Sequence, residues 1–359
     1  MIKIALSLPV DPRTLTHGAR MVCDEFITAL ARQEHGFELE LIGPEQVTRS
    51  FGSIPTFTVP ESASAWRTLK FEQYDLPGIV KASGADVLLM PYSAAPLGSP
   101  VPVVLFEVLG RAAAVRGFAG RLLHAARRAG AQGAARRLIY SDLPIEAAND
   151  PNILTVRPRV HTSFRTLPDP DDRSSASRRE LPPGYVLAHG VSLEDVPLLL
   201  AAWTWVDGSV GDTVPLAALV SEGIESRVWE DQVHRMGLAH SVHLLKEVEF
   251  DELPALYRQA GALLQGGRSL EHQIMRWAMA CGVPVTGFDT PAAADVLGPA
   301  GYLVAPGDTR ALGAACLTVI VEPEVKVRLR KDALMRASAF HKGSDPAETI
   351  NELLERLVG

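Results

Sequence analysis

ALLQGGRSLEHQIMRWAMACGVPVTGFDTPAAADVLGPAGYLVAP, residues Ala262–Pro306, carries the clearest pattern in this chain of 359 residues. An apolar run ends at a pair of glycines, and a helical stripe of apolar residues follows, which begins near Ser269 and stops at Gly282. Val283–Val285 is then a predicted buried strand, and a further helix opens at Asp289. Two strand-to-helix junctions therefore lie close together. In a parallel sheet such junctions gather at the carboxyl edge of the strands, where ligands bind.

The composition predicts two globular domains of ordinary size. The chain is 47% hydrophobic and 21% charged, which is typical of a soluble protein, and either half can bury a sizeable core. The net charge of −7 argues against a nucleic-acid partner. The three cysteines have no paired spacing, which predicts neither a metal site nor a disulfide framework and favours a reducing cytoplasm. Met1–Val10 is too short for a signal peptide, and no apolar run approaches a membrane span.

The amino-terminal half alternates between strand and helix patterns. Ile2–Leu8 is a predicted strand, Ala19–Arg32 a helix and Phe37–Ile42 a second strand, an order that indicates a doubly wound α/β domain. The stretch FEQYDLPGIVKASGADVLLMPYSAAPLGSPVPVVL, residues Phe71–Leu105, predicts one more helix followed by two buried strands.

A second domain follows a segment rich in proline, aspartate and serine, Leu167–Leu181, whose composition predicts an exposed linker. It opens with the strand Tyr185–His189, and a second buried strand, Val214–Val220, precedes Glu222. The chain then continues through the Ala262–Pro306 stretch into predicted terminal helices.

These segments resemble family 4, or group 1, glycosyltransferases of the GT-B fold. The residues that carry the resemblance are Trp277–Val285 (WAMACGVPV), Gly298–Pro306 (GPAGYLVAP) and Phe71–Leu105. The resemblance implies an α/β chain of two Rossmann-like, doubly wound domains that face an interdomain cleft. It implies an acceptor-side domain at 1–166, a linker at 167–181, a nucleotide-sugar domain at 182–341 and a carboxyl-terminal helix at 342–359 that crosses back to the first domain.

The activity implied by the resemblance is retaining transfer of a sugar from a UDP-, GDP- or ADP-linked donor to an unknown acceptor, with no metal and no other cofactor. A diphosphate leaving group needs cationic side chains and helix amino termini. We therefore expect donor-binding residues at Gly190, Ser192, Glu222, Arg268, Ser269, Glu271, His272 and Gln273. The expected acceptor-side or cleft positions are His17, Gly18 and Glu107. The alternative interpretation of Gly18 is a turn glycine, and that of Glu107 is a carboxylate at the start of a helix.

Several positions depart from the family pattern. The arginine and lysine that clamp the diphosphate correspond to Val191 and Val196, and the two glutamates of the donor motif correspond to Ser269 and Trp277. Two hypotheses follow: an active glycosyltransferase with a rebuilt donor site, or a catalytically inactive homologue that acts as a binding or scaffold partner.

A basic segment, Arg111–Arg137, carries seven arginines and no acidic residue. On a helical wheel four of them share one side, and an apolar group shares the other, namely Val115, Phe118, Leu122 and Ala126. Such a helix can lie on an anionic membrane or hold a lipid-linked acceptor. In the first case the protein would be peripheral at the inner face of the membrane. The other interpretation is an ordinary surface helix with a solvated basic face.

Overall fold

The computed structural model describes the chain apart from residues 1, 12, 14–15, 32–36, 92–93, 108–116, 135, 141–152, 157–158, 169–180, 211–212, 247, 267–271, 341–347, 349 and 354–359. The chain folds into two compact units. Unit 1 comprises Met1–Leu15, Val22–Pro158 and Ser344–Gly359, and unit 2 comprises Thr16–Met21 and Arg159–Gly343. Each unit is built around one parallel sheet.

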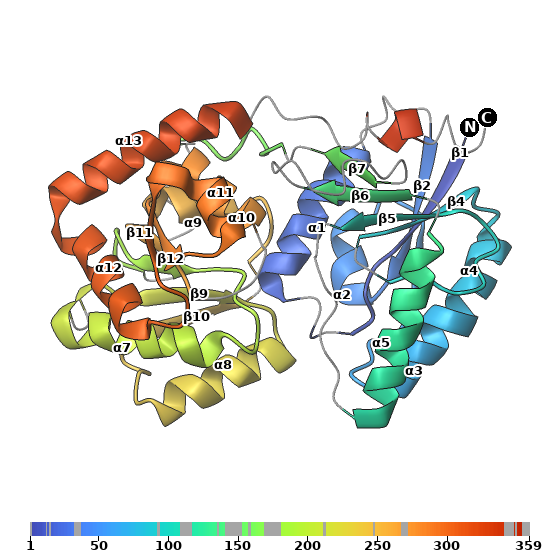
Figure 1. The fold of residues 1–359 in the computed structure, drawn as a ribbon, viewed down its shortest axis with the longest axis horizontal. Helices are drawn as coiled ribbons and strands as arrows, with labels where there is room; N and C mark the ends of the chain where they lie inside the picture. Colours follow the sequence, from blue (N-terminus) through green and yellow to red (C-terminus); the bar gives the residue numbers. More distant parts are fainter. Residues whose placement is uncertain are drawn as a thin grey trace. The chain divides into compact units, whose positions relative to one another are not determined.

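Unit 1 has a seven-stranded parallel sheet in the order β3-β2-β1-β4-β5-β6-β7 (Figure 1). Its strands are β1 Ile2–Ser7, β2 Phe37–Gly43, β3 Thr56–Thr58, β4 Val87–Met90, β5 Val103–Glu107, β6 Arg136–Tyr140 and β7 Ile153–Val156. Neighbouring residues of β1 point to opposite faces, so Leu6 packs into one apolar cluster and Ala5 into another. Both faces are therefore buried, which explains why the strands read as continuous apolar runs.

Helices cover both faces of the unit 1 sheet (Figure 1). They are α1 His17–Leu30, α2 Glu45–Thr48, the 3₁₀ turn Arg49–Phe51, α3 Ala65–Lys70, the π-helical segment η2 Phe71–Asp75, α4 Leu76–Ser83 and α5 Gly117–Gln132. Cys23 and Phe26 of α1 pack on one face, and Leu76 and Val80 of α4 pack on the other. Ile350 and Leu353, near the end of the chain, complete the α1 face.

Helix α5 differs from the sequence prediction for the basic segment. Its buried positions include Leu123, Ala126 and Arg127, whereas Phe118 is 68% exposed and Leu122 is 40% exposed. The predicted faces were therefore wrong at Phe118, Leu122 and Arg127, whereas Ala126 is buried and Arg121 and Arg128 are exposed, as predicted. Arg127 points inward because Glu72 receives it there: Nη2 lies 2.6 Å from Oε1 and Nε lies 3.0 Å from Oε2.

Unit 2 has a six-stranded parallel sheet in the order β10-β9-β8-β11-β12-β13. Its strands are β8 Val186–Ala188, β9 Leu216–Val220, β10 Val242–Lys246, β11 Ala262–Gln265, β12 Val285–Phe288 and β13 Gly301–Val304. Its helices are α7 Val196–Val210, α8 Ile224–Arg235, α9 Leu253–Gln259, α10 His272–Ala280, α11 Pro291–Leu297, the 3₁₀ turn Gly298–Ala300, α12 Thr309–Val321 and α13 Pro323–Phe340. The main apolar cluster joins α7, α8 and α12 to the sheet.

The three cysteines are buried and form no disulfide bond; Cys23 lies in unit 1, and Cys281 and Cys316 lie in unit 2. Burial raises the pKa of the Cys316 thiol to about 12. None of the helices in the described part of the chain is both long enough and apolar enough to cross a bilayer.

Candidate donor site in unit 2

In the sheet of unit 2, the order in which the chain adds strands reverses between β8 and β11. The chain builds β9 and β10 on one side of β8 and then returns to place β11 and β12 on the other. In open α/β sheets, ligands bind beside this point at the carboxyl ends of the strands. The two strand ends are fastened together, because Nε2 of Gln265 donates a hydrogen bond of 2.8 Å to the His189 carbonyl oxygen.

Two glycines shape the loops at this edge. Gly190, the second residue after β8, has φ = 70°, a left-handed conformation that favours glycine. Gly266, directly after β11, lies so close to α7 that a Cβ atom there would come within 2.5 Å of the Cβ of Leu199. Any side chain at position 266 would therefore push α7 away from the strand end. The sequence signal for both positions is the glycine itself, where a strand pattern stops.

A chain of hydrogen bonds runs through the interior beside Gly190. Nε2 of His17 lies 2.9 Å from the Val248 carbonyl oxygen, and Nδ1 of His17 lies 3.0 Å from Nε2 of His189. Nδ1 of His189 lies 2.7 Å from the hydroxyl oxygen of Tyr257. His17 belongs to the short segment Thr16–Met21 that forms part of unit 2, and both imidazoles are fully buried.

The partners fix the positions of the protons in this chain. A carbonyl oxygen can only accept, so His17 carries a proton on Nε2. When His17 is neutral, its Nδ1 accepts from Nε2–H of His189. Nδ1 of His189 then accepts from the Tyr257 hydroxyl. Burial, together with the neighbouring His17, holds the pKa of His189 well below its usual range. His189 is therefore a neutral imidazole at neutral pH.

Glu225, in the first turn of α8, anchors the same region. One carboxylate oxygen, Oε2, accepts hydrogen bonds from the backbone N–H of His17 at 2.7 Å and of Ser221 at 2.8 Å. Burial raises the pKa of Glu225 to about 7 in spite of these hydrogen bonds. We predicted Glu222 for this loop from the sequence, but Glu222 is exposed, and the buried acceptor lies three residues further on. The available signal was an acidic residue in the first turn of a helix.

Trp277 fills the position of the second family glutamate. Its side chain is fully buried and stacks on Phe164, with ring centroids 4.9 Å apart and an interplanar angle of 4°. Phe250 and Tyr257 meet it edge to face, at 5.8 Å and 6.4 Å between centroids. This part of the site is therefore an aromatic core, in which a carboxylate would be desolvated.

The diphosphate-clamp positions are also apolar and buried. Val191 is 2% exposed and Val196 is fully buried, and both lie in the main apolar cluster of unit 2. Asp195, directly before α7, is buried and accepts a hydrogen bond of 2.7 Å from the hydroxyl of Ser192. The hydroxyl that we expected to bind the donor thus donates to a carboxylate in this structure.

The remaining predicted residues are placed as follows. His272 begins α10, and Gln273 is buried, donating from Nε2 to the Arg159 carbonyl oxygen at 3.0 Å. Gly18 lies in the first turn of α1, and Glu107 is the last residue of β5 in unit 1. Arg268, Ser269 and Glu271 lie outside the described residues. No group of three or more side chains suited to a metal ion occurs among the residues that the structure describes.

Comparison with known proteins agrees with this architecture. The family described as glycosyl transferases group 1 matches residues 190–322, the stretch that runs from the β8 turn to the end of α12. No curated protein matches the sequence significantly.

Solved structures resemble the whole chain. WaaG, a glycosyltransferase involved in lipopolysaccharide biosynthesis, has a TM-score of 0.69 at 14% identity, with 98% of this chain and 99% of WaaG covered. HepE from Anabaena, solved with UDP and glucose, has a TM-score of 0.66 at 15% identity, with 100% and 99% covered. UDP-GlcNAc 2-epimerase from Neisseria meningitidis, bound to UDP-GlcNAc, has a TM-score of 0.55 at 14% identity, with 99% and 100% covered.

At these identities the likeness shows the fold, which is GT-B, as the sequence predicted. The predicted resemblance to group 1 glycosyltransferases is confirmed as well. In its overall fold and in the sequence of residues 190–322, the chain is glycosyltransferase-like.

Proposed function

We propose that the protein transfers a sugar from a nucleotide-sugar donor to an acceptor, with the donor bound at the carboxyl edge of the unit 2 sheet. The observation that carries the proposal is the family match over residues 190–322, which contains every loop of that edge after β8. HepE was solved with UDP-glucose, which makes UDP-sugars the first donors to test.

The proposal assigns the diphosphate to the loop between β11 and α10. The turn after β8 carries no lysine or arginine from His189 to Pro197, and its valines are buried. A cation must therefore come from elsewhere, and the sequence places Arg268 between β11 and α10, four residues before His272. The positive end of a helix and a guanidinium together suit a diphosphate. The further proposed contacts are His272 and the backbone N–H of Gln273, in the first turn of α10, because the Gln273 side chain is buried and bonded to Arg159.

Binding is tested by thermal shift and calorimetry with UDP, GDP, ADP and their sugar derivatives. A ligand present at 100 times its dissociation constant stabilises the folded state by about 2.7 kcal/mol, which is readily measured. Arg268→Ala should weaken nucleotide binding by about tenfold or more, because a charge-assisted contact is lost. Arg235→Ala is the matched control, since Arg235 is exposed in the last turn of α8, away from the carboxyl edge.

Three outcomes separate the hypotheses. Binding with release of the nucleotide and loss of the donor sugar supports transfer. Binding without turnover supports the inactive homologue that acts as a binding or scaffold partner. No thermal shift from any nucleotide at millimolar concentration would exclude a nucleotide-sugar enzyme.

We further propose that α5 brings unit 1 to an anionic membrane surface or to a lipid-linked acceptor. Support comes from exposed residues of α5, which include the apolar Phe118 and Leu122 and the basic Arg121 and Arg128. The test is co-sedimentation with vesicles of pure phosphatidylcholine and with vesicles containing phosphatidylserine. Binding to the anionic vesicles should be lost in the Phe118→Ser/Arg121→Ser variant and kept in Leu97→Ser, whose side chain is also exposed in unit 1. Equal binding to both kinds of vesicle would exclude the electrostatic role.

A further inference from the structure

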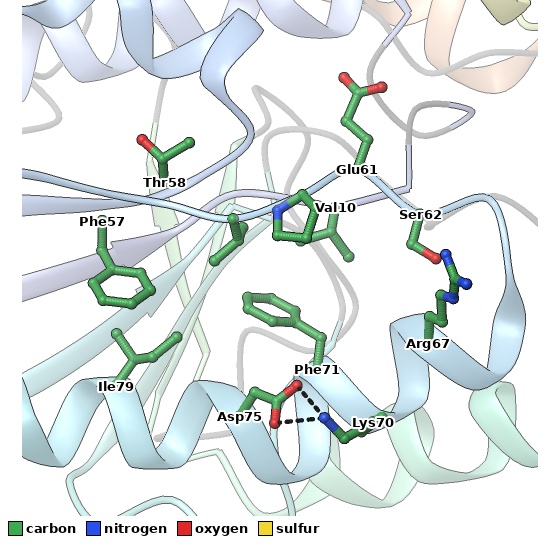
Figure 2. A pocket seen from close by; sticks show the side chains of 12 residues that line it. Val10, Phe57, Thr58, Glu61, Ser62, Arg67, Lys70, Phe71, Asp75 and Ile79 are labelled. Carbon is green, nitrogen blue, oxygen red and sulfur yellow. Dashed lines mark hydrogen bonds and ion pairs between the residues drawn. The ribbon is translucent and has the colours of Figure 1, made fainter.

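Unit 1 contains a pocket of about 570 Å³ beside its edge strand, remote in sequence from the donor site. The pocket lies between the end of β3, the loop that follows it and the helical stretch α3–η2–α4 (Figure 2). Figure 2 shows Phe57, Phe71 and Ile79 facing the opening from β3, η2 and α4. A volume of several hundred Å³ suits a small molecule rather than a few waters.

The lining of the pocket is mainly apolar. Val10, Val59 and Phe71 are buried and form its inner surface, whereas Phe57 is 46% exposed at the opening. An aromatic side chain on an edge strand normally packs against a neighbour or marks a contact surface. Here it lies at the opening of an apolar pocket, so an apolar body in the pocket would cover Phe57.

A π-helical segment in the wall of this pocket helps to fix the shape of the pocket. Residues 71–75 form a π-helical segment inside an otherwise continuous helix from Ala65 to Ser83, and such segments are frequent at functional sites. Its first and last residues, Phe71 and Asp75, line the pocket. The intervening Glu72 is held on the other side by the buried Arg127. The segment is thus anchored behind the pocket, and the lining is preorganised.

Charged groups on the rim select the kind of ligand. Lys70 is neutralised by Asp75, since Nζ lies 3.2 Å from both carboxylate oxygens. The guanidinium of Arg67 is exposed, lines the same pocket and has no ion pair or hydrogen bond within the described part of the chain. The described lining has two acidic residues, Asp75, which pairs with Lys70, and Glu61, on the loop after β3, for which the described residues provide no such cation. Partial burial raises the pKa of Glu61.

We propose that this pocket binds an amphipathic small molecule with a compact aromatic or branched apolar body and an anionic group. The apolar body lies against Phe57, Phe71 and Ile79, and the anionic group contacts Arg67. This site is separate from the donor site, and its ligand needs neither a sugar nor a nucleotide.

The test uses two probes of the same shape, 1-naphthyl phosphate and the neutral 1-naphthalenemethanol, titrated against the full chain by calorimetry and ligand-observed NMR. Both should bind, the phosphate more tightly. Arg67→Ala should weaken the phosphate about fivefold or more and leave the alcohol unchanged, because only the anion uses the guanidinium. Glu61→Gln should strengthen the phosphate about twofold by removing a like charge.

Ile79→Trp should abolish binding of both probes by filling the pocket, and Arg49→Ala is the matched control for loss of an exposed arginine from unit 1. Thermal melts show that each variant is folded. The proposal is overturned if neither probe saturates at millimolar concentration, if Arg49→Ala and Arg67→Ala weaken the phosphate equally, or if Ile79→Trp leaves binding unchanged. Donor binding measured in parallel should be the same in all of these variants, so failure here is distinct from failure of the proposed transferase activity.

Discussion

Nδ1 of His17 lies 3.0 Å from Nε2 of His189, and neither side chain has any exposed surface. One hydrogen lies between the two nitrogens, so the pair cannot be doubly protonated without breaking this contact. Tyr257 and the Val248 carbonyl close the two ends of the chain. A buried, hydrogen-bonded pair of imidazoles therefore lies beside the β8 turn, where the family pattern has a cationic clamp.

Acid should destabilise unit 2 through His189. Its folded pKa is lowered, so the stabilisation is fully present above the unfolded value of 6.5 and is lost as the pH falls toward the folded pKa. The contribution to the slope is up to about 1.4 kcal/mol per pH unit. Urea unfolding followed by tryptophan fluorescence between about pH 5 and pH 7 measures it. His189→Gln should flatten the slope, and an unchanged slope would contradict the burial-driven shift.

Glu225 should act with the opposite sign. Its folded pKa is raised from 4.5 to about 7, so its contribution is fully present below about pH 4.5 and is lost as the pH rises through 7. Glu225→Gln keeps an oxygen acceptor for the His17 and Ser221 N–H groups but cannot ionise. The stability of the variant relative to the parent should rise across this range by up to about 1.4 kcal/mol per pH unit. A constant difference between the two proteins would show that Glu225 does not titrate there.

Returning Trp277 to the glutamate of the family pattern should not create a donor site. Trp277→Glu removes a stacked, fully buried ring and leaves a desolvated carboxyl group, at a cost of about 3–5 kcal/mol. Trp205→Glu is the control, because Trp205 is 50% exposed, and it should cost much less. Chemical unfolding measures both. Tighter nucleotide binding by a stable Trp277→Glu variant would refute the structural role of the ring.

The Glu72–Arg127 pair predicts a contrast between two adjacent arginines. Arg127→Ala leaves Glu72 buried and unpaired and should destabilise unit 1 by about 3–5 kcal/mol. Arg128→Ala, one residue further and exposed, should change the stability by no more than about 0.5 kcal/mol. The double variant Glu72→Leu/Arg127→Met should regain much of the loss, since it removes both charges. Scanning calorimetry of the three variants measures these stability changes, and equal losses in Arg127→Ala and Arg128→Ala would contradict the prediction.

The sequence predicted much of the fold because the strands are apolar on both faces. The predicted strands Ile2–Leu8 and Phe37–Ile42 differ by only one residue from β1 and β2. Strand β3 was missed, because its three residues are all exposed and show no apolar alternation. Helix α12 was missed as well, although its apolar composition suits the packing against α7.

The candidate site was less predictable, because its contacts join residues distant in sequence. His17 meets His189 across 172 positions, and Arg127 meets Glu72 across 55. No local pattern marks such pairs, so the periodicity of α5 assigned Arg127 to the solvent face. The substitutions at Val191, Val196 and Trp277 were visible as departures from a family pattern. Only the structure showed that all three side chains are buried in apolar or aromatic surroundings.

The buried cysteines give each unit its own chemical reporter of opening. Thiol reagents attack the accessible thiolate, and a thiol enclosed by packing reacts only when the surrounding structure opens. Cys23 lies in unit 1, and Cys281 and Cys316 lie in unit 2. Labelling followed by peptide mass spectrometry should therefore time the opening of the two units separately in one unmodified chain. A nucleotide that binds unit 2 should slow the labelling of Cys281 and Cys316 and leave the rate at Cys23 unchanged.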